Sequence, residues 1–321
     1  MRQSNSRLVL TLAVAAALLC SCQKRTKKLI GVVPKATSHL FFMSIHAGAM
    51  DAARDFGVDI LWNGPREETE FSRQIEIVDS MVAQRVDALA ISATDHTALV
   101  APVKRAMAAG IPVTVYDSGL DLTGYVTFVA TDNYGAGVIG ARKLAELVHG
   151  KGKVAELMHK PGGMSTGDRE RAFEETMAKE FPAIQVVDRR YGMADRAKSR
   201  DAAENILTAH PDLDGIFASA EANSLGAMQA LTARGLSGKV KLVTFDFSDE
   251  HVAALKDGTI DVMLVQDPHR IGYEAVHSLV MKLNGETPPA TMDLKARVIV
   301  KQDLEKPDVQ ALLFPKWRET Q

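Results

Sequence analysis

Short runs of apolar residues alternate along the chain with longer stretches in which apolar residues recur at helical spacing. The runs are apolar at successive positions, which is typical of strands buried on both faces of a parallel sheet. They predict strands at 29–33, 58–62, 86–92, 111–116, 154–159, 185–191, 214–219, 240–245, 261–266 and 297–300. A helix pattern lies between most of these runs, and the alternation predicts an α/β fold with parallel sheets.

The pattern also indicates how the chain is divided. The apolar stripe over 42–56 predicts a helix, and Gly57 directly after it predicts a left-handed C-cap. The alternation pauses over 125–140, with four strand–helix units before the pause and about five after it. We therefore expect two similar lobes, each with its own sheet, joined near Thr131.

The N-terminus has the pattern of an export signal. Arg2 and Arg7 precede a twelve-residue apolar run over 8–19, which is too short to span a bilayer and suits a secretory signal. The run ends in Leu-Cys-Ser-Cys, which resembles a bacterial lipobox with Cys22 as the lipidated first residue of the mature protein. An ordinary signal peptide cleaved nearby is the alternative. Residues 22–28 are then a basic tether.

Composition narrows the classes of function. The two cysteines of the chain both lie at the predicted cleavage site, so no disulfide, zinc site or cysteine nucleophile is expected downstream. About 300 residues remain, enough for two ordinary domains. Cleavage would remove two of the 38 basic residues and none of the 40 acidic ones, giving a net charge of about −4. This balance gives no reason to expect a nucleic-acid partner.

Polar and aromatic residues gather after the predicted strands. In open α/β sheets ligands bind beyond the carboxyl ends of the strands, so these positions are the candidate site. They are Lys35, His39, Phe41, Phe42, Asn63, Asp117, Ser118, Arg169, Glu221, Asp246 and Gln266. Carboxylates accept hydrogen bonds from hydroxyls, arginine donates them, and aromatic faces pack on apolar C–H groups. The set predicts one cleft, built from both lobes, that suits a polyhydroxylated ligand.

Each of these residues also has a purely structural interpretation. Phe41 and Phe42 stand at a helix start, where large apolar residues are often part of the core. Asp117 and Asp246 could cap the helices that follow them. His39 has no second His or Cys at ligand spacing, so no metal site is expected. If Phe42 is a pocket wall, Phe42→Ala should weaken ligand binding far more than it lowers the stability of the free protein.

Two motifs point to other chemistries and are set aside. Residues 135–140, Gly-Ala-Gly-Val-Ile-Gly, match a dinucleotide-binding fingerprint, but no strand directly precedes them and no acidic residue ends the next predicted strand. We interpret Asp132 or Asn133 as a helix cap and the glycines as points of close packing between the helix and the sheet. His159, Ser165 and Asp168 lie near one another in sequence, but no nucleophile elbow is present.

Several segments together resemble the periplasmic sugar-binding proteins of ABC transporters, of the ribose-binding type. They are GVVPKATSHLFFMSIHAGAMDAARDFGV, IPVTVYDSGL, FVATDNYGAG, RERAF, LTAHPDLDGIFAS, VTFDFSDE and MLVQDPHRIGYEAV. The likeness spans roughly 28–300 and implies two Rossmann-like lobes with the ligand in the cleft between them. It implies three crossovers at a hinge, near Thr131, Gln266 and Ala296. The lobes would comprise 29–131 with 267–296, and 132–266 with 297–302, followed by a C-terminal extension over 303–321.

The resemblance also implies roles for single residues. Phe41 and Phe42 would flank the sugar, and Asp117 would accept hydrogen bonds from two hydroxyls. Arg169, the arginine of RERAF, would donate to the ligand. The polar ring would be completed by Asp246 and Gln266, with Phe245 beside them. Lys35 and His39 are expected to act as polar selectors.

The chain departs from the ribose-binding pattern at several pocket positions. His39 stands where ribose binders carry asparagine, Ser118 where they carry arginine, and Ala220, followed by Glu221, where they carry asparagine. A phenylalanine in the pocket of the ribose binders corresponds to a position near Ala194 in this chain. Val-Pro-Lys at Lys35 and Trp-Asn-Gly-Pro at 62–65 are more similar to the rhamnose- and autoinducer-2-binding relatives. The expected ligand is a monosaccharide, deoxy-sugar or similar polyol.

The expected function is therefore capture of such a ligand by an exported, lipid-anchored, monomeric protein. It would deliver the ligand to an ABC permease in the inner membrane, with no cofactor and no catalysis. The alternative is a sensor subunit for a chemotaxis or two-component receptor, which would have the same fold and pocket. A lactose-repressor-type regulator would need an N-terminal helix-turn-helix, where this chain has the export signal.

Overall fold

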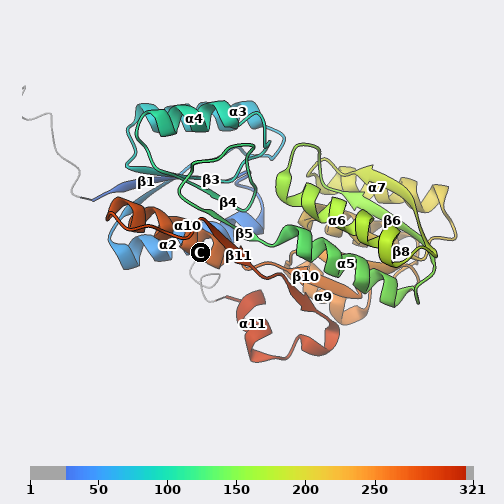
Figure 1. Cartoon of the computed structure of the whole chain (residues 1–321). Helices are drawn as coiled ribbons and strands as arrows, with labels where there is room; N and C mark the ends of the chain where they lie inside the picture. The colour runs from blue at the N-terminus through green and yellow to red at the C-terminus, as the bar shows by residue number, and fades with distance from the viewer. Residues whose placement is uncertain (1–26, 316–321) are drawn as a thin grey trace, which may run out of the picture.

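A computed structural model describes residues 27–315, which form two α/β lobes (Figure 1). The first lobe contains a six-stranded sheet of order β11-β5-β4-β3-β1-β2, and the second a six-stranded sheet of order β12-β10-β9-β8-β6-β7. The first sheet comprises β1 (Leu29–Val33), β2 (Asp59–Trp62), β3 (Ala88–Ile91), β4 (Val113–Tyr116), β5 (Phe128–Thr131) and β11 (Thr291–Leu294). The second comprises β6 (Gly152–Met158), β7 (Ile184–Tyr191), β8 (Gly215–Ala218), β9 (Lys241–Phe245), β10 (Val262–Val265) and β12 (Arg297–Ile299).

Helices cover both faces of each sheet (Figure 1). In the first lobe, one face carries α2 (Leu40–Phe56) and α10 (Pro268–Leu283), and the other carries α3 (Phe71–Ala83) and α4 (Val100–Ala108). In the second lobe, one face carries α5 (Asn133–Leu147) and α6 (Met164–Glu180). The other carries α7 (Arg196–Ala209), α8 (Glu221–Ala233) and α9 (Asp249–Asp257). None of the helices within residues 27–315 is both long and apolar enough to cross a membrane.

The chain passes between the two sheets three times, after β5, after β10 and between β11 and β12. The predicted α/β architecture, with two mainly parallel sheets, is confirmed. Every pairing in the first sheet is parallel, whereas β12 runs antiparallel to β10 in the second. The sequence pattern missed β5 and β11. Both are four residues long, and β11 lies at the sheet edge with most of its side chains exposed or half-buried, so no continuous apolar run marks it.

Glycines allow two pairs of helices to approach closely. A Cβ on Gly48 of α2 would lie 1.9 Å from the backbone oxygen of His269, and one on Gly272 of α10 would lie 2.0 Å from that of Ile45. Any side chain at either position would separate these helices. In the Gly-rich motif, a Cβ on Gly137 would lie 2.3 Å from the backbone oxygen of Arg169, and Asp132 caps α5 by accepting from the Gly135 N–H. The cap is confirmed, and so is helix–sheet packing at Gly140, where a Cβ would lie 2.6 Å from the Phe217 ring of β8; the close contact of Gly137 is with another helix instead.

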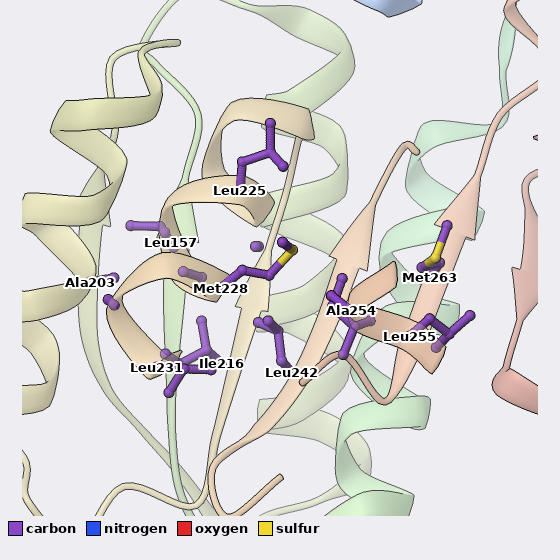
Figure 2. Close-up of a cluster of buried hydrophobic side chains, with 14 of the residues drawn as sticks. Leu157, Ala203, Ile216, Leu225, Met228, Leu231, Leu242, Ala254, Leu255 and Met263 are labelled. Atoms are coloured by element: carbon purple, nitrogen blue, oxygen red, sulfur yellow. The ribbon is translucent and has the colours of Figure 1, made fainter. Parts of the chain in front are cut away.

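The C-terminal segment belongs to the core of the second lobe. The sequence assigned 303–321 to an extension, but Leu304, Val309 and Leu313 are buried in the same cluster as the residues of α7 and α8. Figure 2 shows part of this cluster, with Leu225 and Met228 of α8 packing over the sheet. The last described helix, α11 (Pro307–Leu313), therefore stabilises the lobe that it covers. The predicted signal peptide lies outside the described residues, as does most of the tether.

A buried histidine makes the stability of this lobe sensitive to acid. His251 of α9 is fully buried, and its Nδ1 lies 2.8 Å from Oγ of Ser248, the N-cap residue of the helix. Its Nε2 has no hydrogen-bond partner among the described residues. Burial lowers the pKa of His251 to about 4, because the charged ring would lose its hydration, and the attraction of Glu250 offsets this only in part.

We expect His251 to destabilise the folded protein as the pH falls. The folded-state pKa lies below the unfolded value of 6.5, so the neutral ring contributes fully above pH 6.5, and this contribution is lost as the pH falls towards 4. Wild type should lose about 3 kcal/mol more than His251→Gln between pH 7 and pH 4. Urea denaturation of both proteins at the two pH values measures this. Parallel pH dependences would contradict the assignment.

Candidate functional site

A small cavity lies between the lobes. The first lobe contributes Lys35, His39, Phe41, Phe42, Glu68 and Asp117. The second contributes His159, Ser165, Thr166, Arg169, Ala220, Glu221, Ala222 and Asp246, and Gln266 lies at the crossover after β10. The cavity therefore lies at the carboxyl ends of strands from both sheets, which is the edge that the sequence predicted.

Two aspartates hold corresponding positions in the two lobes. Asp117 directly follows β4, and Asp246 directly follows β9. Both have left-handed backbone conformations, with φ of 57° and 66°. Such conformations are uncommon for residues other than glycine, although aspartate tolerates them best, and they concentrate at functional sites. In both lobes, the turn after the strand presents a carboxylate to the cavity.

Lys35 neutralises the carboxylates of the first lobe. It is only 5% exposed, and its Nζ lies 3.3 Å from Asp117 Oδ2 and 3.4 Å from Glu68 Oε2. Burial alone would lower the pKa of Lys35, but the attraction of Asp117 and Glu68 outweighs it and raises the pKa. Burial likewise opposes ionisation of Glu68, but Lys35 and His159 hold its pKa well below the usual value. This wall of the cavity is therefore a compact, charge-balanced cluster.

Glu68 also connects the two lobes. Its Oε2 lies 3.1 Å from Nε2 of His159, the residue after β6, while the backbone N–H of His159 donates to Glu170. A second contact runs from Lys160 Nζ to the backbone oxygen of Thr94, at 2.6 Å. The structure therefore shows the lobes in direct polar contact across the cleft.

Arg169 is positioned by residues of its own lobe. Its Nε donates to Asn133 Oδ1 at 2.8 Å and its Nη1 to the backbone oxygen of Ser219 at 2.9 Å. The guanidinium stacks on the ring of Phe245, with Cζ 4.0 Å from the centroid. Burial lowers the pKa of Arg169, and the nearby carboxylates, Asp246 first among them, counter this. A rigidly held arginine in the wall is suited to donate to an oxygen of a ligand.

Gln266 connects the cavity to a crossover between the lobes. Its Nε2 donates to Asp246 Oδ1 at 2.7 Å, and its Oε1 accepts from the Thr131 hydroxyl at 2.6 Å. Thr131 ends β5, where the chain first leaves the first sheet. One side chain thus joins two crossover segments to a cavity carboxylate.

Glu221 begins α8 and has an incompletely satisfied carboxyl group. Asp246 Oδ2 accepts from the backbone N–H of Glu221 at 3.2 Å. Burial, followed by repulsion from Asp246, raises the pKa of Glu221 to about 8, although the backbone N–H of Phe41 partly stabilises the ionised form. Its Oε2 is buried and has no hydrogen-bond partner among the described residues. The same is true of the Thr166 hydroxyl. Both groups lie on the cavity wall.

Phe41 and Phe42 have different positions. Phe42 is 1% exposed and packs in the core cluster with Ile45 and Val32, although one side of it reaches the cavity. Phe41 is only partly buried and meets the Phe42 ring edge-to-face at 5.2 Å between centroids. Phe42→Ala should therefore also lower the stability of the free protein, because the same side chain fills the core. Phe41 is the better candidate for a wall that contacts a ligand.

Nine of the twelve residues proposed from the sequence line the cavity. The other three lie elsewhere. Asn63 is exposed outside the cavity, because the loop after β2 turns inward only at Glu68. Ser118 is fully buried behind Asp117, where its hydroxyl accepts from the Ser165 N–H at 3.4 Å. Phe245 is fully buried beneath Arg169 and supports that side chain from behind.

Sequence reasoning missed several residues of the wall. Glu68 lies six residues beyond the end of β2, whereas only the first polar residues after each strand were considered. From the sequence, His159, Ser165 and Asp168 were considered only as a possible catalytic group. In the structure, His159 pairs with Glu68, whereas Asp168 pairs with Arg171 on the surface. The position of His159 at the end of its strand was the available signal. Thr166 and Ala222 carried no such signal, whereas Ala220 was noted only as a departure from the ribose-binding pattern.

The chain belongs to the periplasmic binding protein family. Residues 30–287 match the family described as the periplasmic binding protein domain. The ribose import binding protein of Bacillus subtilis is 30% identical over 257 residues, which cover 80% of this chain and 82% of that protein. The D-ribose/D-allose-binding protein of Pseudomonas aeruginosa is 30% identical over 83% of this chain and 86% of its own length.

Solved structures agree in fold over most of the chain. An ABC transporter solute-binding protein from Agrobacterium vitis, bound to α-D-tagatopyranose, superimposes with a TM-score of 0.86 at 32% identity, covering 90% of this chain and all of that one. A carbohydrate transporter solute-binding protein from Agrobacterium radiobacter, in complex with D-arabinose, superimposes with a TM-score of 0.88 at 30% identity. This match also covers 90% of this chain and all of that one. The predicted likeness to ABC-transporter sugar-binding proteins is confirmed.

The two phenylalanines should respond differently to truncation. Phe42→Ala should lower the free energy of unfolding by about 3–5 kcal/mol, because it empties a core position. Phe41→Ala should cost clearly less, because that side chain is only partly buried. Urea denaturation of the ligand-free proteins measures both changes. Equal losses in the two variants would show that Phe41 is also a core residue and contradict the assignment.

Proposed function

We propose that this protein captures a monosaccharide or related polyhydroxylated ligand in the cavity between its lobes and delivers it to an ABC importer. The observation that carries the proposal is the cavity itself. It combines charged hydrogen-bonding groups from both lobes with an aromatic wall, and two of its buried polar atoms have no partner among the described residues. Buried polar groups are nearly always satisfied, so unpartnered atoms at a cavity wall favour a ligand that completes them.

The chemistry of the wall suits a sugar. Asp117 and Asp246 present carboxylate oxygens that accept from hydroxyls, and Arg169 presents N–H groups that donate to hydroxyl or ring oxygens. Phe41 offers an apolar surface for the C–H groups of a ring. Sugars combine both kinds of surface, and the relatives described above are named for ribose and allose or were solved with tagatose and arabinose.

The departures at His39, Ser118 and Ala220 bear on the choice of sugar. In this structure His39 and Ala220 line the cavity, whereas Ser118 lies behind it. Two of the three differences from the ribose pattern are therefore in positions to contact a ligand. We infer that the ligand is a sugar or polyol other than ribose.

We infer that binding is coupled to closure of the lobes about the three crossovers. These are the segments near Thr131, Gln266 and Ala296, each of which lies between strands of different sheets. The Thr131–Gln266 hydrogen bond holds two of them together. The polar contacts from His159 to Glu68 and from Lys160 to Thr94 would break on opening. A ligand that contacts both lobes favours the closed state by its differential affinity.

We propose that the mature protein begins at Cys22 and is anchored to a membrane through lipid on that residue. The support is the sequence pattern, since Cys22 lies outside the described residues. Two or more acyl chains give stable anchoring. The basic segment over 23–28 would then hold the lobes away from the bilayer. The lobes would work on the periplasmic side, as a monomer.

A sugar ligand should stabilise the folded protein measurably. Residues from Lys24 onward would be screened by thermal shift with pentoses, hexoses, deoxy-sugars, amino sugars and polyols. A ligand at 100 times its Kd should add about 2.7 kcal/mol of stability. Asp117→Asn should weaken the binding of a hit by roughly 10–100-fold, as expected for a lost hydrogen bond to a charged group. Asn63→Ala, outside the cavity, is the matched control. A well-folded sample that no member of the panel stabilises would overturn the proposal.

The lipid anchor is testable separately. Wild type expressed in a bacterium that processes lipoproteins should sediment with membranes and incorporate labelled palmitate. Cys22→Ser should remove both properties and leave the ligand affinity of the purified protein unchanged, because the substitution lies before the first described strand. Membrane association without palmitate incorporation, equal in wild type and variant, would argue against the anchor.

A further inference from the structure

The carboxylates of the cavity are neutralised unevenly. In the first lobe, Glu68 and Asp117 both form ion pairs with Lys35. In the second lobe, the hydrogen bonds that Asp246 accepts from the described residues come from the neutral groups Gln266 Nε2 and the Glu221 backbone N–H. Within residues 27–315, neither Glu221 nor Asp246 has a basic side chain within the 4.0 Å of an ion pair. The cavity carboxyl groups without an ion-pair partner are therefore on the second lobe.

The carboxyl group of Glu221 lacks a hydrogen-bond donor for one of its oxygens, as well as an ion-pair partner, among the described residues. Its Oε2 is buried at the cavity wall without a hydrogen-bond partner among the described residues. Glu221 lies in the first turn of α8, where the exposed N–H groups of a helix favour a negative charge. The helix N-terminus therefore favours the ionised form of Glu221, but Oε2 is still free to accept a hydrogen bond from a ligand. A buried acceptor of this kind is costly unless a donor reaches it.

The two fixed cations of the cavity are already held elsewhere. Lys35 is engaged by Glu68 and Asp117 on the opposite wall. Arg169 donates to Asn133 and to the backbone of Ser219 and is stacked on Phe245. A neutral ligand would leave Glu221 and Asp246 without an ion-pair partner among the described residues and the pKa of Glu221 raised. A ligand with one positive group beside these two residues would supply that partner and favour the ionised form of Glu221.

We propose that the ligand is an amino sugar whose ammonium group lies against Glu221 and Asp246. This inference rests on the proposed sugar-binding function and narrows it. An ammonium group carries three donors and a charge, so it can donate to Glu221 Oε2 and to Asp246 together. A hydroxyl carries one donor and no charge. The hydroxyls and apolar face of the same ring would contact Asp117, Arg169 and Phe41 on the rest of the wall.

Matched ligands test the proposal without altering the protein. The mature chain would be titrated by calorimetry with D-glucosamine and D-glucose, and with D-galactosamine and D-galactose. The N-acetyl derivatives keep the nitrogen but remove its charge. We expect the amine of at least one pair to bind at least tenfold more tightly than the parent sugar, and N-acetylation to remove this preference.

Variants then assign the preference to the carboxylates. Glu221→Gln should reduce the amine-to-parent affinity ratio at least tenfold, and Asp246→Asn provides a second variant should the first fail to fold. Glu204→Gln is the control for overall charge, because Glu204 lies on α7 and pairs with Arg234 away from the cavity. It should leave the ratio unchanged.

The possible failures are distinguishable. If neutral sugars bind as tightly as their amino counterparts, or if the ratio survives in both cavity variants, the amino-sugar inference is overturned and the sugar-binding function stands. If neither neutral nor amino sugars bind to a well-folded sample, both are overturned.

Discussion

The site depends on the direction in which the strands run. In a parallel sheet all carboxyl ends meet at one edge, so the turns that follow the strands are neighbours in space however far apart they are in sequence. Here the two sheets place these edges on either side of one cleft. Lys35 and Asp117 reach it from β1 and β4, and His159 and Asp246 reach it from β6 and β9. Three passages of the chain between the sheets keep the edges opposed.

The second physical constraint is the cost of burying charge. Removing ionised groups from water costs several kcal/mol per ion unless partners replace the lost hydration. Lys35 meets this requirement for Asp117 and Glu68, and Gln266 meets it in part for Asp246. The groups left over, above all Glu221 Oε2, are those that no other described residue satisfies. The cost of buried charge therefore also indicates what a ligand must supply.

The sequence predicted the elements that its patterns mark strongly. Continuous apolar runs located most strands, and the rule on strand ends located Asp117, Arg169, Asp246 and most of the wall. It missed β11, because that edge strand carries no apolar run, and it missed β5, because its short run was taken as part of the pause over 125–140. It also missed Glu68, because the path of a loop depends on tertiary packing.

The type of a residue alone did not predict whether its side chain is buried in the core or exposed to the cavity. Phe41 and Phe42 are identical neighbours, yet one is partly buried at the cavity and the other fills the core. Phe245 and Ser118 are likewise one layer behind the wall, where they support residues that reach the cavity. Adjacent positions after a strand differ in this way because the backbone turns there, as the left-handed conformations of Asp117 and Asp246 illustrate. These distinctions required the structure.

The most direct test of the account is a crystal structure of the mature chain grown with the tightest-binding sugar of the panel. We predict electron density for one sugar ring enclosed between the lobes, in contact with Phe41 and within hydrogen-bond distance of Asp117 and Arg169. Density for the sugar at any other place, such as the cleft near the crossovers lined by His269 and Lys295, would contradict it.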